Sequence, residues 1–369
     1  MTNKITEILN KGLAEKVYPG AVLLIARKEG IVFFDTVGNR TLRPEPLPME
    51  KETRFDLASL TKPLATTLAA MKLVEDNLLD LDEPISSLIE PFPWKDKADI
   101  TPRLLLNHSS GLADWKPYYL ELIQLPIKER KPAVRRLIME ETLREKPYTV
   151  SLYSDLGFIV LEWIIEIMTG IDLSSFLNTT FYQPLGLKNL HLDTVAREPM
   201  TKKGLYAATE DCPWRKEIIQ GHVHDENAYA LGGYSGHAGL FGTAHNIFTL
   251  STALVSIYHG HNTGMLKSKT VRTFLSRQEI VPGSTWALGW DTPSKNNSTS
   301  GNCFSTNSIG HTGFTGTSLW IDVEKNITVI FLTNRIHLNR SNEKIRKFRP
   351  ELHNVIMQEL ANRHRIVMT

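Results

Sequence analysis

Ser59-Leu60-Thr61-Lys62 stands at the start of a predicted helix, and this stretch brings a hydroxyl and an amine within reach of each other. Side chains three residues apart lie on one face of a helix, so the Lys62 ammonium can approach the Ser59 hydroxyl. Pro63 agrees with a helix that starts here, because proline is tolerated in the first turn, where the amides lack intrahelical acceptors. Taken alone, the pattern also fits an ordinary helix start with a surface lysine. With further support from other segments, Ser59 is a candidate nucleophile and Lys62 its proton partner.

The sequence around this stretch is mainly helical, whereas both ends of the chain are rich in strand patterns. Helical spacing dominates from about residue 59 to about residue 261. Residues 1–16 and 341–363 each predict an amphipathic helix. Strands are predicted at residues 20–27, 31–37, 286–290, 317–323 and 327–333.

These elements predict an α+β fold. One antiparallel sheet would be assembled from both ends of the chain and flanked by helices, with a mainly helical region inserted between them. Residues 1–58 and 265–369 would form the sheet subdomain, and residues 59–264 the helical subdomain. The active site would lie in the cleft between the two, where pockets commonly form.

The length and net charge of the chain indicate which classes of partner are unexpected. The 369 residues, of which 41% are hydrophobic, supply a full core. Because 42 basic residues face 40 acidic ones, no strong field attracts a polyanion, and nucleic acid is not expected as a partner. No secretory signal and no window of about twenty apolar residues is found, so we expect a cytoplasmic protein without membrane contact. Cys212 and Cys303 are expected to be reduced.

A second candidate segment is Tyr153-Ser154-Asp155, which lies in a turn just before another predicted helix. A phenol beside an ammonium can be drawn toward ionisation, so Tyr153 is a plausible general base. The plainer interpretation is a helix cap by Ser154 or Asp155 next to a packed tyrosine.

A third candidate segment is His311-Thr312-Gly313-Phe314-Thr315-Gly316, which precedes a predicted strand. Its glycines would let the backbone approach a bound substrate closely. By itself the segment also fits a glycine-rich entry into a strand.

In this order and spacing, the three segments resemble the serine β-lactamase and penicillin-binding-protein superfamily. The resemblance is to the branch close to class C β-lactamases and their esterase and D-aminopeptidase relatives, and it covers nearly the whole chain. Residues 55–59, 104–112, 239–244 and 287–290 are similar to further segments of that family.

The resemblance implies a serine hydrolase that acts on ester or amide bonds through an acyl-enzyme and needs no cofactor. Ser59 would be the nucleophile, Lys62 its proton partner, and Tyr153 the general base that also activates water for deacylation. The backbone amides of Ser59 and Phe314 would form the oxyanion hole, aimed at charge that develops only in the tetrahedral state.

The resemblance also implies that Asp155, His311, Thr312 and Gly313 contact the substrate, a small ester, amide or peptide. His311 stands where β-lactamases and transpeptidases of the family mostly carry lysine. A fixed cation there helps to hold the carboxylate of a penicillin or of a terminal D-alanine, whereas a histidine is largely neutral at pH 7. The sequence therefore favours esters and small amides over β-lactams.

Two other hypotheses stay open at this point. His222 and His224, with His237 further along, are residues that bind zinc in many proteins, so a metal-dependent hydrolase is possible. A non-catalytic ligand-binding or sensor domain of the same fold is the other hypothesis. Retention of Ser59, Lys62 and Tyr153 together argues against a pure binding module. The sequence makes no prediction of the oligomeric state.

Overall fold

The computed structural model of the chain describes residues 2–90, 94–192 and 205–367. Its largest sheet is antiparallel and has six strands in the order β3-β2-β1-β11-β10-β9. The strands come from both ends of the chain: β1 (Gly20–Arg27), β2 (Gly30–Thr41), β3 (Leu47–Pro48), β9 (Ile309–Thr312), β10 (Ser318–Asp322) and β11 (Ile327–Thr333). The predicted α+β fold, with one sheet built from both ends of the chain, is confirmed.

The remaining elements lie mostly between these two groups of strands. The helical ones are α1 (Thr2–Ala14), η1 (Ala58–Leu60), η2 (Lys62–Thr66), α2 (Thr67–Glu75), α3 (Ile85–Leu88), η3 (Lys95–Lys97), α4 (Pro102–Leu106), α5 (Tyr119–Leu122), α6 (Ile127–Glu140), α7 (Asp155–Thr169), α8 (Leu173–Leu177), η4 (Asn178–Tyr182), α9 (Glu226–Ala230), α10 (Ala244–Tyr258), α11 (Ser268–Leu275) and α12 (Ile345–Val367). The short strands are β4 (Phe55–Asp56), β5 (His191–Leu192), β6 (Ala208–Cys212), β7 (Glu217–Gln220) and β8 (Leu240–Gly242).

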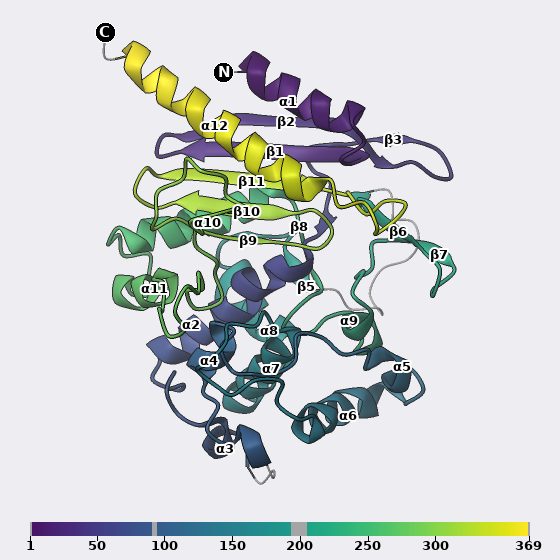
Figure 1. Cartoon of the computed structure of the whole chain (residues 1–369), viewed down its shortest axis with the longest axis vertical. Helices are drawn as coiled ribbons and strands as arrows, with labels where there is room; N and C mark the ends of the chain where they lie inside the picture. Colours follow the sequence, from purple (N-terminus) through teal and green to yellow (C-terminus); the bar gives the residue numbers. More distant parts are fainter. Residues whose placement is uncertain (1, 91–93, 193–204, 368–369) are drawn as a thin grey trace.

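The sheet is covered on both faces. Side chains alternate between the faces of a strand, and in β1 Leu23 and Ile25 point to one core while Val22 and Leu24 point to another. The first of these cores is closed by α1 and α12, which lie together over the outer face of the sheet (Figure 1). The second core joins the sheet to α10 and to the helical part of the chain.

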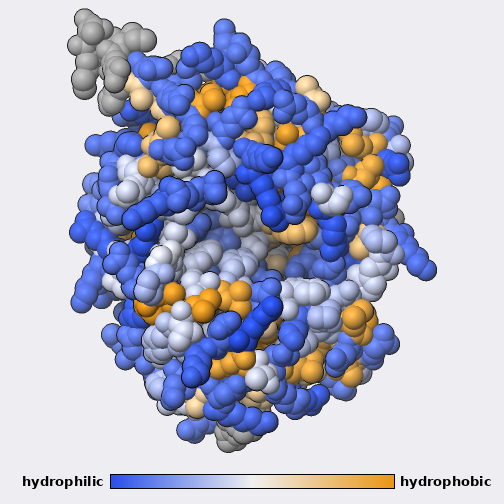
Figure 2. Space-filling view, viewed as in Figure 1, coloured by the Kyte–Doolittle hydropathy of each residue, from blue (hydrophilic) through white to orange (hydrophobic). Residues whose placement is uncertain are grey.

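The helical part shares its core with the sheet. One continuous cluster contains Val22 and Leu332 from the strands together with Leu64 and Ile165 from the helices. Helix α10 lies against β1 and β11, although the predicted boundary placed its residues with the helical subdomain. The division into residues 1–58 with 265–369 and residues 59–264 stays a prediction. In space-filling view the surface is hollowed between the sheet half and the helical half (Figure 2).

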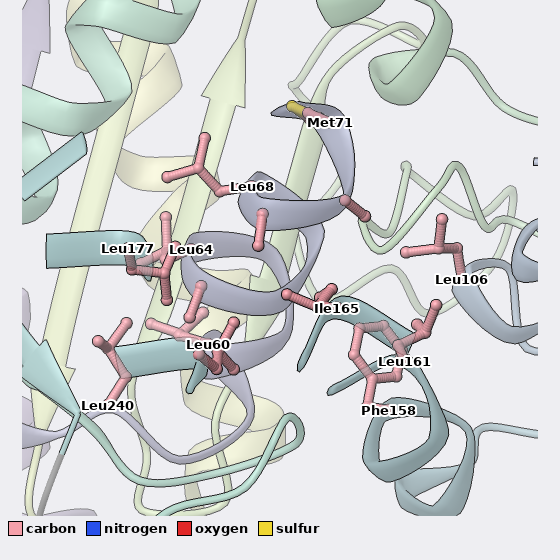
Figure 3. Close-up of a cluster of buried hydrophobic side chains, with 14 of the residues drawn as sticks. Leu60, Leu64, Leu68, Met71, Leu106, Phe158, Leu161, Ile165, Leu177 and Leu240 are labelled. Carbon is pink, nitrogen blue, oxygen red and sulfur yellow. The ribbon is translucent and has the colours of Figure 1, made fainter. Parts of the chain in front are cut away.

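The helix that follows Ser59 is buried on several sides. Leu60, Leu64, Leu68 and Met71 recur at helical spacing and have no more than a trace of exposed surface. They pack with side chains from α4, α7, α8 and β8 (Figure 3). Burying a leucine side chain stabilises a fold by about 1.5 to 3 kcal/mol. The segment that carries Ser59 and Lys62 is therefore anchored in the centre of the protein.

One predicted strand is wrong. Residues 286–290 form a tight turn, in which the Ala287 amide donates to the Trp290 carbonyl at 2.8 Å. Gly289 has a φ of 75°, the left-handed region that glycine tolerates, and its amide donates to the Leu106 carbonyl at 2.8 Å. Only an isolated bridge joins Trp286 to Asp291. The apolar residues of this segment predicted a strand. They are buried because the segment forms a turn that packs on α4.

Two smaller expectations can be compared with the structure. Cys212 and Cys303 are free thiols. Among the helices that the structure describes, none combines the length and the apolar character needed to cross a bilayer.

Candidate active site

Ser59 lies in the short turn η1, half-buried at the end of the small strand β4. The residue before it, Ala58, has a φ of 47°, a left-handed conformation that is strained for any residue with a side chain. Asp56 holds this turn, because its carboxylate accepts the Ala58 amide at 2.9 Å and the His224 amide at 2.7 Å. Burial raises the pKa of Asp56. The backbone around Ser59 is thus fixed from both sides.

Lys62 is completely buried and directs its amine at the serine. Its Nζ donates to Ser59 Oγ at 3.2 Å, to Asp155 Oδ1 at 2.6 Å and to the His237 carbonyl at 3.2 Å. Burial acts to lower the pKa of Lys62, but the Asp155 carboxylate and Tyr153 act to raise it, and the net direction is upward. Lys62 is therefore an ammonium ion in the resting site, held by Asp155.

Tyr153 stands beside both groups. The Lys62 Nζ lies 4.8 Å from the centre of its ring, and hydrogen bonds that Lys62 and Ser59 donate to the phenol oxygen act to lower the pKa of Tyr153. The ring packs against His108, Trp286 and His311. Tyr153 lies just before α7, as predicted from the sequence. Ser154 caps this helix by accepting the Gly157 amide.

The expected ionisation of Tyr153 is not what the surroundings favour. Burial raises the pKa of Tyr153, and the neighbouring Asp155 carboxylate raises it further, while Lys62 acts in the opposite direction. The net direction is upward, so the phenol is neutral at rest. The sequence-based expectation considered only the effect of the Lys62 ammonium on Tyr153. In the folded site the Asp155 carboxylate pairs with Lys62 and offsets the effect of its positive charge. Asp155 pairs with Lys62 and also lines the pocket beside Ser59, so its contact with the substrate stays a prediction.

The strand β9 and the residues after it lie against the turn that carries Ser59. Thr315 donates its hydroxyl to the Asp56 carbonyl at 2.8 Å, and Thr317 donates to the Leu57 carbonyl at 3.1 Å. A Cβ on Gly313 would collide with Thr317 Oγ1 and would lie 2.6 Å from the Leu57 carbonyl. Such close approach to the turn that carries Ser59 requires glycine at this position, and the predicted approach of residue 313 to a bound substrate stays a prediction.

The amides of Ser59 and Phe314 belong to these two adjoining segments. Within the described residues neither amide donates to a protein acceptor. Phe314 is held by other groups: Arg335 Nε donates to its carbonyl at 2.9 Å, and the His224 ring and the Arg335 guanidinium contact its exposed side chain. Free backbone amides held next to a reacting carbonyl stabilise a developing oxyanion, which is the role predicted for these two amides.

His311 is buried and neutral. Its Nδ1 donates to the Thr312 carbonyl at 2.9 Å, and its Nε2 has no partner among the described residues. Burial and the nearby Lys62 ammonium lower the pKa of His311 to about 3. The position therefore carries no charge at neutral pH, in line with the sequence-based expectation.

The cleft has two lobes that meet at Ser59, Tyr153 and Phe314. One lobe has a volume of about 590 Å³ and contains the segment His311–Phe314 together with Arg335, Arg346 and Arg349. The other has a volume of about 340 Å³ and its wall includes Trp115, Asp155, Asp225, Glu226 and Arg340. We call them the arginine lobe and the carboxylate lobe.

Arg349 is the residue that the sequence-based prediction missed most clearly. Its side chain is buried, its Nε has no partner among the described residues, and its Nη2 donates a 3.4 Å hydrogen bond to the Thr317 carbonyl. Burial and the charge of Arg335 lower the pKa of Arg349 to about 9. A signal was present in the sequence, because Arg349 interrupts the apolar stripe of Ile345, Leu352 and Ile356 on α12.

The histidines of the metal hypothesis do not form one group. In the part of the chain that the structure describes, the one set with metal-binding spacing is Asp155, Asp225 and His237, whose ligand atoms lie within 4.8 Å of one another. The Lys62 ammonium already pairs with Asp155 there. His224 Nε2 instead contacts Glu210 Oε2 at 3.0 Å, so the predicted set of His222, His224 and His237 is not assembled.

His237 and Asp225 form a buried pair near Lys62. His237 Nε2 lies 3.0 Å from Asp225 Oδ1. Burial acts to lower the pKa of His237, but Asp225 outweighs it and the net direction is upward. Burial acts to raise the pKa of Asp225, and the charge and hydrogen bond of His237 bring it well below its usual range. Asp225 is thus a stable carboxylate, and it also caps α9 by accepting the Ala228 amide at 2.8 Å.

Comparison with known proteins agrees with this geometry. The family model described as Beta-lactamase matches residues 5–353. The chain belongs to the β-lactamase family. A relative from Salmonella agona named "Putative D-alanyl-D-alanine carboxypeptidase" is 30% identical over 355 residues, covering 89% of this chain and 81% of that protein. The predicted family and the prediction of a serine hydrolase are confirmed, and the hypothesis of a non-catalytic domain is set aside.

Solved structures of similar proteins share this fold over most of the chain. EstCE1, described as a hydrolase with promiscuous acyltransferase activity, superposes with a TM-score of 0.74 at 23% identity, covering 96% of this chain and 98% of that one. The octameric penicillin-binding protein homologue from Pyrococcus abyssi superposes with a TM-score of 0.71 at 21% identity, covering 92% and 75%. At such identities the similarity establishes the fold alone.

Proposed function

We propose that this protein hydrolyses ester or amide bonds through a covalent acyl-enzyme on Ser59. The observation that carries the proposal is the 3.2 Å contact between Lys62 Nζ and Ser59 Oγ, with Tyr153 beside both. A serine hydroxyl is a weak nucleophile until a neighbouring group takes its proton, and an amine and phenol at this distance supply that group. The 0% exposure of the Lys62 side chain keeps water from competing for its contacts.

The reaction would run in two halves. The pair of Lys62 and Tyr153 would first release one proton to solvent and would then accept the Ser59 proton as Oγ bonds to the substrate carbonyl carbon. The amides of Ser59 and Phe314 would donate to the oxyanion. As the tetrahedral state collapses and the bond to the leaving group breaks, Tyr153 would protonate the leaving group. The phenolate would then take a proton from a water molecule as the water oxygen bonds to the acyl carbon, and the phenol would return that proton to Ser59 Oγ as the bond between Oγ and the acid product breaks.

The leaving group, we propose further, carries a carboxylate. The buried Arg349 has few partners, and a buried unpaired cation is costly unless an anion completes the site. Arg335 and Arg346 line the same lobe, so they supply positive charge that the neutral His311 does not. The relative named as a D-alanyl-D-alanine carboxypeptidase fits such a substrate. The proposed role of these arginines differs from the sequence-based expectation, in which the neutral His311 left a substrate carboxylate without a cation.

Kinetics on matched substrates test this proposal. N-acetyl-D-alanyl-D-alanine and its C-terminal amide differ only in the carboxylate. We expect at least about tenfold higher kcat/KM for the free acid, since a charge-assisted hydrogen bond contributes about 1.5 to 3 kcal/mol. Arg349→Met should remove this preference, whereas Lys347→Met, an exposed residue of the same helix, should keep it. Equal rates for the two substrates in the wild type would exclude the carboxylate, and turnover by Ser59→Ala would exclude the serine mechanism.

Two other predictions from the sequence remain proposals. We propose that the substrate is a small molecule and that the protein does not bind nucleic acid. The cytoplasm stays the predicted compartment. The reaction as proposed needs no cofactor, because every step uses side chains and amides of this chain.

A further inference from the structure

A buried carboxylate in the middle of α7 holds the chain segment 235–237. The Glu162 side chain is 4% exposed, and its Oε2 accepts Ser235 Oγ at 2.5 Å and the Gly236 amide at 2.9 Å. Lys131, on the neighbouring helix α6, donates to Oε1 at 2.7 Å. Burial acts to raise the pKa of Glu162, but these three donors outweigh it and the net direction is downward. Glu162 is therefore an ion whose two oxygens are both in use, as a buried charge requires.

The segment 235–237 is packed tightly onto the same helix. A Cβ on Gly236 would lie 2.1 Å from the Phe158 carbonyl and 3.0 Å from Glu162 Cβ. Phe158 and Glu162 are four residues apart, so they lie on one face of α7. Contact with this face and the hydrogen bonds to Glu162 together fix the direction in which the carbonyls of the segment point.

Two of these carbonyls accept hydrogen bonds from η2, which begins at Lys62. The Gly236 carbonyl accepts Thr66 Oγ1 at 2.6 Å, and the His237 carbonyl accepts Lys62 Nζ at 3.2 Å. Lys62 Nζ in turn donates to Ser59 Oγ at 3.2 Å. A continuous path of hydrogen bonds thus leads from the middle of α7 to the amine beside Ser59.

We infer that Glu162 is a positioning residue that, through the segment 235–237, holds the Lys62 amine against the serine. Asp155, at the start of α7, holds the same amine from a second direction at 2.6 Å. Two acceptors in fixed places define the position of an amine that one acceptor alone would leave free to swing. The inference rests on the proposed function, because the position of the amine affects the rate only if it handles the serine proton. A displacement of about 1 Å at a reacting group can lower a rate about a hundredfold.

Glu162→Met and Glu166→Met form a matched pair of variants. Both replace an acid of α7 that pairs with Lys131, and Glu166 lies one turn further along the helix. Glu166 also pairs with Arg135, and within the described residues it makes no hydrogen bond to the segment 235–237. Loss of an ion pair is therefore common to both variants, whereas only Glu162→Met releases the segment.

The rate at which a fluorophosphonate probe labels Ser59 is the measurement. Labelling forms a bond between Ser59 Oγ and phosphorus and releases fluoride, so it depends on removal of the serine proton. Mass spectrometry of the intact protein gives the final labelled fraction, which counts the folded sites, and the rate constant then refers to those sites alone. We expect Glu162→Met to lower the maximal rate constant about ten- to hundredfold and to leave the half-saturating probe concentration within about twofold. Glu166→Met should leave both within about twofold.

A second pair of variants changes no charge. Ser235→Ala removes one of the two hydrogen bonds between the segment and Glu162, and it should lower the maximal rate constant about threefold or more. Ser251→Ala is its control, because Ser251 is a buried serine of α10 whose Oγ has no partner among the described residues. This pair decides the question if Glu162→Met does not fold.

The outcomes separate the inference from the proposed function. Equal maximal rate constants for Glu162→Met and Glu166→Met would overturn the inference and leave the serine mechanism intact. Where Glu162→Met does not fold, an unchanged rate constant in Ser235→Ala would overturn it. If wild type is not labelled, or Ser59→Ala is labelled equally fast, the proposed function fails and the inference fails with it.

Discussion

Replacing Asp155 with asparagine should move the activity of this enzyme to lower pH. Asp155 Oδ1 lies 2.6 Å from Lys62 Nζ, and its charge raises the pKa of both Lys62 and Tyr153. In the proposed mechanism one of these two groups must lose a proton before Ser59 can be activated. Removing the carboxylate charge makes that loss easier whichever group gives up the proton. The Asp155→Asn change keeps the size of the side chain.

The size of the shift follows from the geometry. Lys62 and Asp155 are 0% and 18% exposed, so solvent screens their interaction weakly. Two unit charges about 4 Å apart at an effective dielectric constant of about 20 interact by about 4 kcal/mol, equivalent to roughly three pKa units. Opposite charges at such distances shift a pKa by about one to three units. We therefore expect the acid limb of the kcat/KM profile to move down by about one to three pH units.

The assay is the pH dependence of kcat/KM on a neutral ester, measured for wild type, Asp155→Asn and Asp114→Asn. Asp114 is an exposed carboxylate paired with Arg144 outside the cleft, so its replacement should leave the limb in place. An acid limb of Asp155→Asn that stays where it is, or moves to higher pH, would refute the reasoning. A uniform loss of rate without a shift would mean that Asp155 serves the reaction in another way.

Two further predictions concern the oxyanion site and the metal hypothesis. Gly313→Ala should lower kcat by about two to three orders of magnitude, because the added Cβ collides with Thr317 Oγ1 and the Leu57 carbonyl and displaces the Phe314 amide. Gly157→Ala, whose Cβ would meet neighbours at 3.6 Å or more, is the control, and a fully active Gly313→Ala would contradict the role of that amide. Dialysis against a chelator should leave the activity unchanged, and a loss restored by zinc would support the metal hypothesis.

The sequence predicted those features well that depend only on residues close together in the chain. The strands at 20–27 and 327–333 were predicted at the bounds that the structure has, because their apolar runs end at clear turn residues. Gly313 was predicted from sequence as a glycine that lets the backbone approach a substrate, and the structure shows a different close approach there, to Thr317 and Leu57, that also requires glycine. The turn at Tyr153 was predicted from the cap of the following helix, which Ser154 forms.

The sequence was less informative where the outcome depends on distant neighbours. The rise in the pKa of Tyr153 comes from burial and from Asp155 together, and only the folded arrangement reveals how far these outweigh Lys62. Residues 286–290 have the composition of a strand, but the left-handed Gly289 turns the chain back on α4. Arg349 interrupts the apolar stripe of α12, but that spacing does not predict that this part of the helix borders the cleft beside Ser59.

The proposed mechanism depends on a covalent bond to one oxygen atom. Incubation with a slowly released ester, followed by acid quenching and mass spectrometry of the intact protein and its peptides, would detect that bond directly. We predict one acyl group per chain, on the peptide that contains Ser59, and none in Ser59→Ala. An acyl group on another residue, or full turnover with no adduct at any time and undiminished activity in Ser59→Ala, would contradict the mechanism.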